Sequence, residues 1–303
     1  MAFYLGIDGG GTRTRCALGD ESAVLGSAVS SGSNVVRLGA AQAREALHTA
    51  VREVCAAAEV SPHQIKNVCI GVAGAARPEV AATVRDILAE LTSASIEVVG
   101  DMAIALEAGF GSGRGVIAIA GTGSIVYGRD AGGRTARAGG WGFAVSDEGS
   151  GHWIGRRAVS AILRARDEGR ESTLANGVLE AWNLKDFDAL VQTANSLPPP
   201  DFPRLFPVVL RIAGEGDPLA QSLLAEAGSE LAKLAVMVIR HLPHPPYAPV
   251  AMTGSVFRQS AEVRQVFYNS LQASFPGIEI RREMVDPVEG ALALARKAGL
   301  NKG

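Results

Sequence analysis

A glycine-rich turn between two short strands near the N-terminus leaves few folds open to this chain. Residues 3–7 are apolar, Asp8 follows them, and the turn consists of Gly9, Gly10, Gly11 and Thr12. In residues 13–18, Arg13, Arg15 and Ala17 alternate with Thr14, Cys16 and Leu18, which is the two-residue period of a second strand. The pattern predicts a hairpin. It differs from a dinucleotide-binding or Walker A loop, which leads into a helix, and no Gly-Lys-Ser/Thr occurs here.

Such a hairpin can present several backbone N–H groups to an anion, because glycine allows close approach and positive φ. Asp8 would repel a phosphate unless a divalent cation lay between them. We therefore predict that Asp8 faces a Mg²⁺–nucleotide complex through metal-bound water. The alternative is a tight hairpin in which the aspartate is only structural.

A second copy of the pattern occurs in residues 115–128, where strand, turn and strand follow in the same order around Gly121, Thr122, Gly123 and Ser124. Two such hairpins indicate a duplicated domain with a nucleotide between the two halves.

The composition indicates a globular protein and argues against membrane proteins and nucleic-acid binders. A chain of 303 residues with 47% hydrophobic and 20% charged residues is typical of a globular protein with room for two domains. The chain has no apolar run of about 18 residues and no N-terminal export signal, so we expect no membrane contact and a cytoplasmic location. A net charge of −2 without a basic run argues against nucleic acid. Cys16, Cys55 and Cys69 lack metal-ligand spacing and are expected in the core.

The first half of the chain continues as alternating strands and helices. The predicted elements are a third strand at 23–29, a helix at 39–58, a strand at 67–73, a helix at 78–91, a strand at 95–99 and a helix at 103–108. A small-residue turn at Gly74 and the pair Gly100-Asp101 follow two of these strands.

The second half begins with strands at 117–120, 125–128 and 134–138. The later predicted elements are a glycine-rich loop at 139–151, a helix at 153–166, a helical insertion near 174–213, a helix at 217–241 ended by prolines at 243–246, a strand at 250–257 with a Gly254-Ser255 turn, a helix near 259–273, a strand at 278–281 and a terminal helix from 286. The order predicts an α/β fold with a mixed sheet and a βββαβα pattern in each half.

The motifs Asp8–Thr12, Gly121–Ser124 and Gly139–Gly142, the last followed by Asp147–Ser150, are similar to those of the acetate kinase, sugar kinase, Hsp70 and actin superfamily. Within it the chain resembles the BadF/BadG-type ATPase family, which includes N-acetylglucosamine and glucosamine kinases. The resemblance implies two duplicated actin-like (ribonuclease H-like) domains, 1–112 and 113–303, with ATP in the cleft between them. The terminal helix is expected either in the second domain or packed back on the first.

The resemblance also implies a role for each candidate residue. Asp8 would face Mg²⁺, and Asp101 would be the base that takes the proton from a sugar hydroxyl. Phosphates and nucleoside of ATP would be bound by Gly9, Gly10, Gly11, Thr12, Gly121, Thr122, Gly123, Gly254 and Ser255. The sugar would be bound by Asn34, Gly74, Gly140, Trp141, Asp147 and Glu148. Structural alternatives are an N-cap role for Asp101 and capping of the 153–166 helix by the acids.

These assignments predict an ATP-dependent kinase that phosphorylates an amino sugar such as N-acetylglucosamine or glucosamine, at its 6-hydroxyl. One alternative is a BadF-type ATPase activator, which would need cysteines that bind a cluster. Another is a non-catalytic sugar sensor or actin-like protein. Ile125 and Ser146 depart from residues common in amino-sugar kinases, so the preferred sugar is left open, as is pairing into a homodimer.

Overall fold

Strand β1 (Phe3–Gly9) lies at the centre of a five-stranded mixed sheet in the computed structural model, which describes residues 2–242 and 247–300. Its antiparallel neighbour is β2, and its parallel neighbour is β4. The sheet order is β3-β2-β1-β4-β5, and the other strands are β2 (Arg13–Gly19), β3 (Val24–Ser31), β4 (Ile65–Val72) and β5 (Ser95–Gly100).

A second five-stranded sheet repeats this arrangement. Its strands are β6 (Gly115–Ala120), β7 (Ser124–Arg129), β8 (Thr135–Gly139), β9 (Val250–Thr253) and β10 (Ile280–Met284). The order β10-β9-β6-β7-β8 matches the first sheet, with β9 parallel to β6 and β7 antiparallel to β8. The predicted α/β fold with two mixed sheets is therefore confirmed.

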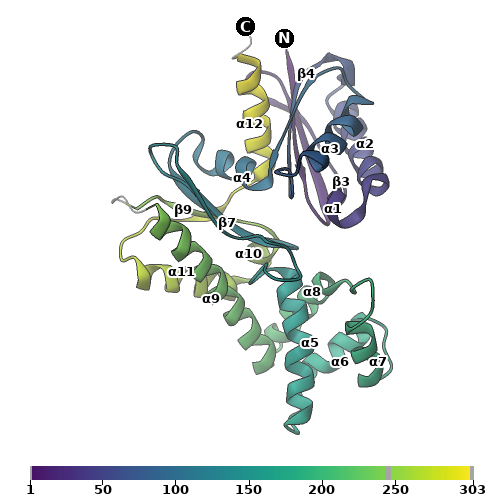
Figure 1. Cartoon of the computed structure of the whole chain (residues 1–303), viewed down its shortest axis with the longest axis vertical. Coiled ribbons are helices and arrows are strands. Elements are labelled where there is room, and N and C mark those ends of the chain that lie inside the picture. The colour runs from purple at the N-terminus through teal and green to yellow at the C-terminus, as the bar shows by residue number, and fades with distance from the viewer. Residues whose placement is uncertain (1, 243–246, 301–303) are drawn as a thin grey trace. The chain divides into compact units, whose positions relative to one another are not determined.

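The chain divides into two units, which Figure 1 traces from purple to yellow. Unit 1 comprises residues 1–115 and 285–303, and unit 2 comprises residues 116–284. The proline segment 243–246, which we predicted to end a helix, lies outside the described residues. Among the residues that the structure describes, no helix is both long and apolar enough to cross a membrane.

Helices cover both faces of the sheet in unit 1 (Figure 1). They are α1 (Val35–Leu38), α2 (Ala40–Ala57), the 3₁₀ helix η1 (Pro62–Gln64), α3 (Pro78–Ala89), α4 (Asp101–Phe110) and α12 (Pro287–Leu300). Leu5 and Ile7 of β1 pack into the core under α2, whereas Tyr4 packs with α12 on the other face. This alternation is the two-residue period of a strand buried on both sides.

The terminal helix α12 packs very closely on unit 1. A side chain at Gly6 would bring a Cβ within 2.3 Å of the Leu292 backbone nitrogen, and one at Gly290 would bring a Cβ within 1.9 Å of the Ile104 carbonyl oxygen. These glycines allow α12 to approach both β1 and α4 at backbone distance. Lys297 of α12 also pairs with the buried Glu107 of α4 at 2.5 Å. As a result, α12 and α4 pack side by side on the sheet and against each other.

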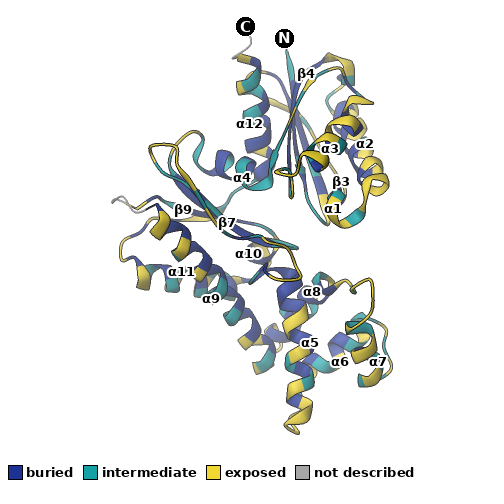
Figure 2. Ribbon diagram, viewed as in Figure 1, coloured by how far each residue is buried: buried dark blue, intermediate teal, exposed yellow. Residues whose placement is uncertain are grey.

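Unit 2 has a larger helical part, which contains the predicted insertion. The helices are α5 (Gly151–Asp167), α6 (Thr173–Ala181), α7 (Phe187–Ala194), the 3₁₀ helix η2 (Phe202–Leu205), α8 (Phe206–Gly214), α9 (Pro218–His241), α10 (Ser255–Gln259) and α11 (Ala261–Ser274). Figure 2 shows that buried residues line the inner faces of α9 and α11, while the far end of α5 is exposed.

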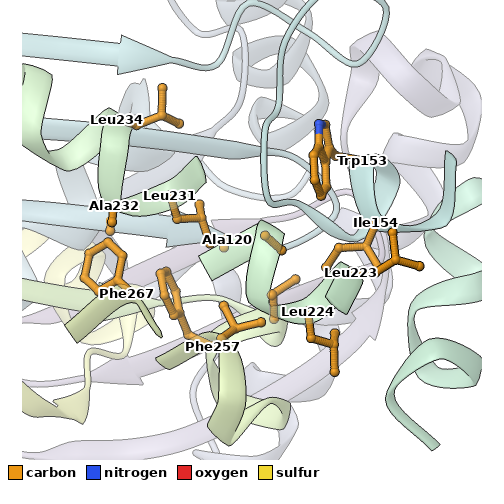
Figure 3. Packing of buried hydrophobic residues seen from close by; sticks show 14 of the residues in the cluster. Ala120, Trp153, Ile154, Leu223, Leu224, Leu231, Ala232, Leu234, Phe257 and Phe267 are labelled. Atoms are coloured by element: carbon orange, nitrogen blue, oxygen red, sulfur yellow. The ribbon is translucent and has the colours of Figure 1, made fainter. Parts of the chain in front are cut away.

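One hydrophobic core joins the strands and helices of unit 2, as Figure 3 shows. Phe257 and Phe267 are fully buried and meet edge to face, with ring centroids 5.1 Å apart, which is a favoured aromatic geometry. Ala120 at the end of β6 and Trp153 in the first turn of α5 belong to the same core. The core therefore anchors both segments that flank the second glycine turn.

Candidate functional site

The first glycine turn is closed by its own backbone. The Gly10 N–H donates to the Arg13 carbonyl at 3.0 Å, and the residues Gly10, Gly11 and Thr12 are partly or fully exposed. There is no room for a side chain at the start of the turn, because a Cβ on Gly9 would lie 2.7 Å from Val72 Cγ1. The turn thus combines a close-packed base with a backbone edge that an anion can approach.

A short segment after β3 holds this turn in place. The Ser33 N–H donates to the Gly10 carbonyl at 3.1 Å. The buried hydroxyl of Thr14 donates to Ser33 Oγ, and the oxygens lie 2.7 Å apart. A Cβ on Gly32 would lie 2.6 Å from the Gly11 carbonyl oxygen, so the two backbones are in direct contact. Thr14 and Ser33, which were not among the predicted site residues, give the turn a rigid support.

Asp8 and Asp101 lie at the same edge of the sheet in unit 1. The edge is formed by the carboxyl ends of the parallel strands β1, β4 and β5, where Asp8 pairs with Gly71 and Gly71 pairs with Val99. Two strand spacings separate the backbone of Asp8 from that of Val99, which is about 10 Å. Asp101 follows two residues after Val99. Clefts at this edge are the usual ligand sites of open α/β sheets.

Asp101 is the first residue of α4 and is not its N-cap, which is Gly100. The side chain is partly buried, and Oδ1 accepts the N–H of Met102 at 3.0 Å. Removal from water raises the pKa of Asp101, although the backbone N–H groups of Met102 and Asp101 act in the opposite direction. A carboxylate with a raised pKa is a stronger base than an exposed aspartate.

Asn34 and Gly74 lie near each other at this edge. Asn34 is the N-cap of α1, and its Oδ1 accepts the Arg37 N–H at 3.1 Å. Gly74 is exposed with φ of 83°, and a Cβ there would lie 3.2 Å from Val36 Cγ2. The structure therefore gives Asn34 a capping role, and sugar binding by both residues stays a prediction. Arg37 was not among the predicted site residues.

The Arg37 side chain brings a cation to the first glycine turn. Its Nη1 lies 3.5 Å from the Gly11 carbonyl oxygen, and the side chain is exposed. A guanidinium matches the geometry of phosphate oxygens better than any other side chain does. Arg37 is thus an additional candidate for contact with a bound nucleotide.

The second glycine turn is bound to the start of α5. The Gly121 N–H donates to the Gly123 carbonyl at 2.9 Å and closes the turn. The carbonyls of Gly121 and Thr122 accept the N–H groups of Gly151 and His152 at 2.8 and 3.2 Å. These bonds satisfy two of the N–H groups that a helix N-terminus leaves unpaired. The first amides of α5 therefore hold the turn and are not offered to a ligand.

The Gly254-Ser255 turn lies directly beside the second glycine turn. Gly254 has φ of 105°, and a Cβ there would lie 2.1 Å from the carbonyl oxygen of Ala120. Only glycine fits this approach. The helix predicted near 259–273 corresponds to α11, but the strand predicted at 250–257 ends at Thr253, and the short helix α10 that follows it was not predicted. Two of the segments predicted to bind ATP therefore meet within unit 2.

The acids of the glycine-rich loop also reach this turn. A Cβ on Gly123 would lie 3.1 Å from Asp147 Oδ2, and Ser124 Oγ donates to the Glu148 carbonyl at 2.7 Å. Asp147 is buried with φ of 69°, a strained backbone conformation for a residue with a side chain. The N-cap of α5 is Ser150, whose Oγ accepts the Trp153 N–H, so neither acid occupies the N-cap position.

Gly140 and Trp141 lie where the loop leaves β8. Gly140 has φ of 69°, and a Cβ there would lie 2.8 Å from Ile125 Cδ1. Trp141 is 71% exposed. The loop backbone therefore runs close over β7 and turns the indole outward.

The residues fit the predicted Mg²⁺ only as part of a nucleotide complex. No group of three or more His, Cys, Asp or Glu side chains arranged to hold a metal occurs within residues 2–242 and 247–300. Mg²⁺ commonly keeps several waters and binds one or two carboxylates together with substrate phosphates. Asp8 beside the glycine turn matches this mode of binding.

Duplicated mixed sheets with a glycine turn after the first strand of each define an actin-like ATPase. Residues 5–295 match the family model described as BadF/BadG/BcrA/BcrD ATPase family, so the chain belongs to this family. The predicted family resemblance is confirmed.

Curated relatives match over almost the full length. An N-acetylmuramic acid/N-acetylglucosamine kinase of Clostridium acetobutylicum is 32% identical, covering 98% of this chain and 99% of that protein. An N-acetyl-D-glucosamine kinase of Dictyostelium discoideum is 28% identical, covering 96% and 97%. A solved structure of a candidate N-acetylglucosamine kinase from Chromobacterium violaceum has a TM-score of 0.77 at 26% identity and covers 97% of this chain and 99% of that one.

Proposed function

We propose that this protein is an ATP-dependent kinase that transfers the γ-phosphate to a hydroxyl of an amino sugar, N-acetylglucosamine or glucosamine. The proposal rests on the contact in unit 2 between the second glycine turn and the loop that follows β8. A Cβ on Gly123 of the turn would lie 3.1 Å from Asp147 Oδ2 of the loop. A turn suited to phosphate and an acid suited to sugar hydroxyls thus lie side by side. The names of the full-length relatives in Clostridium and Dictyostelium support the same function.

The residues are assigned as follows. We propose that Asp8 binds Mg²⁺ through water, and that Asp101 accepts the proton of the acceptor hydroxyl, which we take to be the 6-hydroxyl. Contacts to ATP are assigned to Gly9, Gly10, Gly11, Thr12, Gly121, Thr122, Gly123, Gly254 and Ser255. Contacts to the sugar are assigned to Asn34, Gly74, Gly140, Trp141, Asp147 and Glu148.

The chemistry asks mainly for alignment and charge stabilisation. In the transfer, the sugar oxygen forms a bond to the γ-phosphorus, the bond to the β-phosphate oxygen breaks, and ADP leaves. Asp101 takes the proton that the sugar hydroxyl loses. Backbone N–H groups of the two glycine turns donate to phosphate oxygens, and Mg²⁺ supplies positive charge when bound. Asp147 and Glu148 orient the sugar by accepting from its other hydroxyls.

The cysteines argue against the activator alternative. Cys16, Cys55 and Cys69 are free and buried. Burial raises the pKa of Cys55 to about 11 and that of Cys69 to about 12, so both thiols stay protonated at neutral pH. A metal cluster requires accessible thiolates. The buried thiols therefore favour the kinase over an ATPase that serves an electron-transfer partner.

One assay tests the function. Purified protein is incubated with ATP, Mg²⁺ and single sugars: N-acetylglucosamine, glucosamine, N-acetylmuramic acid, glucose and the 6-deoxy form of N-acetylglucosamine. We expect ADP release only with an amino sugar that carries a free 6-hydroxyl, and a phosphorus coupling to the C6 protons in the product by NMR. ADP release that is independent of sugar would contradict the proposal and favour the activator. No release with any sugar would favour a sensor.

A further inference from the structure

The loop after β8 presents an indole ring to solvent. Trp141 is 71% exposed, although tryptophan is among the residues that gain most from burial. Gly139, Gly140 and Gly142 have φ of 72°, 69° and 104°, a backbone path that other residues adopt only with strain. The backbone of this loop, and not core packing, therefore sets the outward direction of the ring.

Arg137 of β8 holds one face of this ring. Its guanidinium carbon lies 4.0 Å from the centroid of Trp141. The same guanidinium donates through Nη2 to the carbonyls of Gly139 and Gly140, at 3.1 and 3.3 Å. A cation over an aromatic face is attracted by the ring's quadrupole. Arg137 thus ties the indole to the backbone that carries it, and the ring is held in a defined orientation.

The exposed ring lies on the loop that leads to the predicted sugar-binding acids. The loop also exposes Phe143 and Val145, which are 48% and 78% exposed, and it ends at Asp147 beside Gly123. Within unit 2, Phe143 packs against His152 of α5, with ring centroids 5.0 Å apart, whereas Trp141 and Val145 are the more exposed side chains of the loop. A pyranose has hydroxyls at its edge and C–H groups on its faces. Such C–H groups carry a slight positive charge and complement the negative face of an indole.

We propose that the exposed face of Trp141 stacks on the C–H face of the acceptor's pyranose ring, and that Arg137 is the positioning residue for this contact. The inference rests on the proposed kinase function and defines how the sugar is recognised. Asp147 and Glu148 would then bind hydroxyls at the edge of the same ring. A cyclic sugar is therefore selected over an open-chain polyol with the same hydroxyls, because the polyol has no flat C–H face.

Binding is measured first without ATP, by iodide quenching of tryptophan fluorescence. Trp153 is 7% exposed and Trp182 is partly buried, so iodide quenches mainly Trp141. N-acetylglucosamine should protect the wild-type protein from iodide, and its open-chain alditol should not. Trp141→Phe should remove both the iodide-sensitive signal and its protection. In Arg137→Met the anisotropy of tryptophan fluorescence should fall, because the ring moves more freely.

Kinetics then separate positioning from a general structural role. Trp141→Ala should raise KM for the sugar about tenfold, and Arg137→Met about two- to fivefold, with KM for ATP within about twofold of wild type. Arg137→Lys should give an intermediate value, because it keeps the charge but loses the planar fork. The control is Arg134→Met, since Arg134 pairs with Asp130 at the far end of the β7–β8 hairpin. It should leave KM for both substrates unchanged.

The double variant Arg137→Met/Trp141→Ala decides whether Arg137 acts through the ring. It should match Trp141→Ala alone in KM for the sugar. A further increase of the same factor in the double variant would overturn the positioning role. If wild-type protein phosphorylates the sugar but the sugar gives no protection from iodide, the stacking is wrong and the proposed function stands. If wild-type protein neither phosphorylates nor is protected by any sugar, both are wrong.

Discussion

Replacing Asp101 with asparagine should lower catalysis and raise stability at the same time. Asparagine has nearly the same shape, and its Oδ1 can keep the bond from the Met102 N–H, which is 3.0 Å long in the structure. It has no negative charge and cannot accept the proton of the sugar hydroxyl. General base catalysis contributes roughly 10²–10⁴-fold to such reactions. We therefore expect turnover to fall at least about a hundredfold, with ATP affinity unchanged.

The stability effect follows from the direction of the pKa shift. Burial raises the pKa of Asp101 in the folded protein above its value in the unfolded chain. The folded protein therefore binds this proton more tightly than the unfolded chain does. Below the pKa of Asp101 in the unfolded chain, the carboxyl is protonated in both states and burial of its charge costs no stability. As pH rises through the pKa of the folded state, the free energy of unfolding falls, because the charged carboxylate is disfavoured where it is buried. Each tenfold difference in proton affinity corresponds to about 1.4 kcal/mol at neutral pH. Asp101→Asn removes this cost.

The assay combines turnover with denaturant unfolding between pH 3 and pH 8, about the range that brackets aspartate titration. Wild type and Asp101→Asn should have similar unfolding free energies near the acid limit and diverge toward neutral pH, with the variant more stable. Asp86→Asn is the control, since Asp86 is an exposed acid on α3, and it should change neither property. Turnover close to wild type would remove Asp101 from the base role. A variant that is less stable at neutral pH would refute the burial argument.

Two further changes test the packing of unit 1 and the first glycine turn. Gly290→Ala should lower the unfolding free energy by roughly 3 kcal/mol in urea titrations, because its Cβ would lie 1.9 Å from the Ile104 carbonyl oxygen. Gly214→Ala meets no atom within 4 Å and should instead stabilise by about 0.5–1 kcal/mol, and equal effects of the two would contradict the packing argument. Arg37→Ala should weaken a non-hydrolysable ATP analogue more than ADP in calorimetry, because Arg37 Nη1 lies 3.5 Å from the Gly11 carbonyl oxygen in the first glycine turn, which we propose binds the phosphates. Equal weakening of both ligands would argue against a contact with the γ-phosphate.

Most strands and helices were predictable from local patterns. The hairpin strands around residues 8–13 and 120–124 were found because glycine turns and two-residue periodicity involve neighbouring residues only. The short helix α10 was missed, because Val256 and Phe257 extend the apolar run of β9 and were predicted as strand. Ser260 then separates α10 from α11. Its hydroxyl accepts the Val263 N–H at 3.2 Å and begins α11 as a new helix.

The places of candidate site residues in the fold were predictable where a residue type is itself informative, as with Asp101 directly after a strand or Gly121 in a turn. Thr14, Ser33 and Arg137 were missed. Each is an ordinary polar residue of a strand or turn, and its role comes from what it contacts. Thr14 donates to Ser33 at 2.7 Å across 19 residues of chain, a contact that no local pattern indicates. The assignments of all the site residues stay predictions.

The amino-acid sequence alone was enough to specify the glycine turns, the two mixed sheets and the ATPase family, because these depend on backbone freedom, side-chain period and short motifs. Folding in three dimensions was needed to show that the Gly123 turn touches Asp147, that Gly254 approaches the Ala120 backbone, and that Arg137 covers Trp141. The physical reason is that such contacts form between segments distant along the chain. Their distances are set by how strands and helices pack around a shared core.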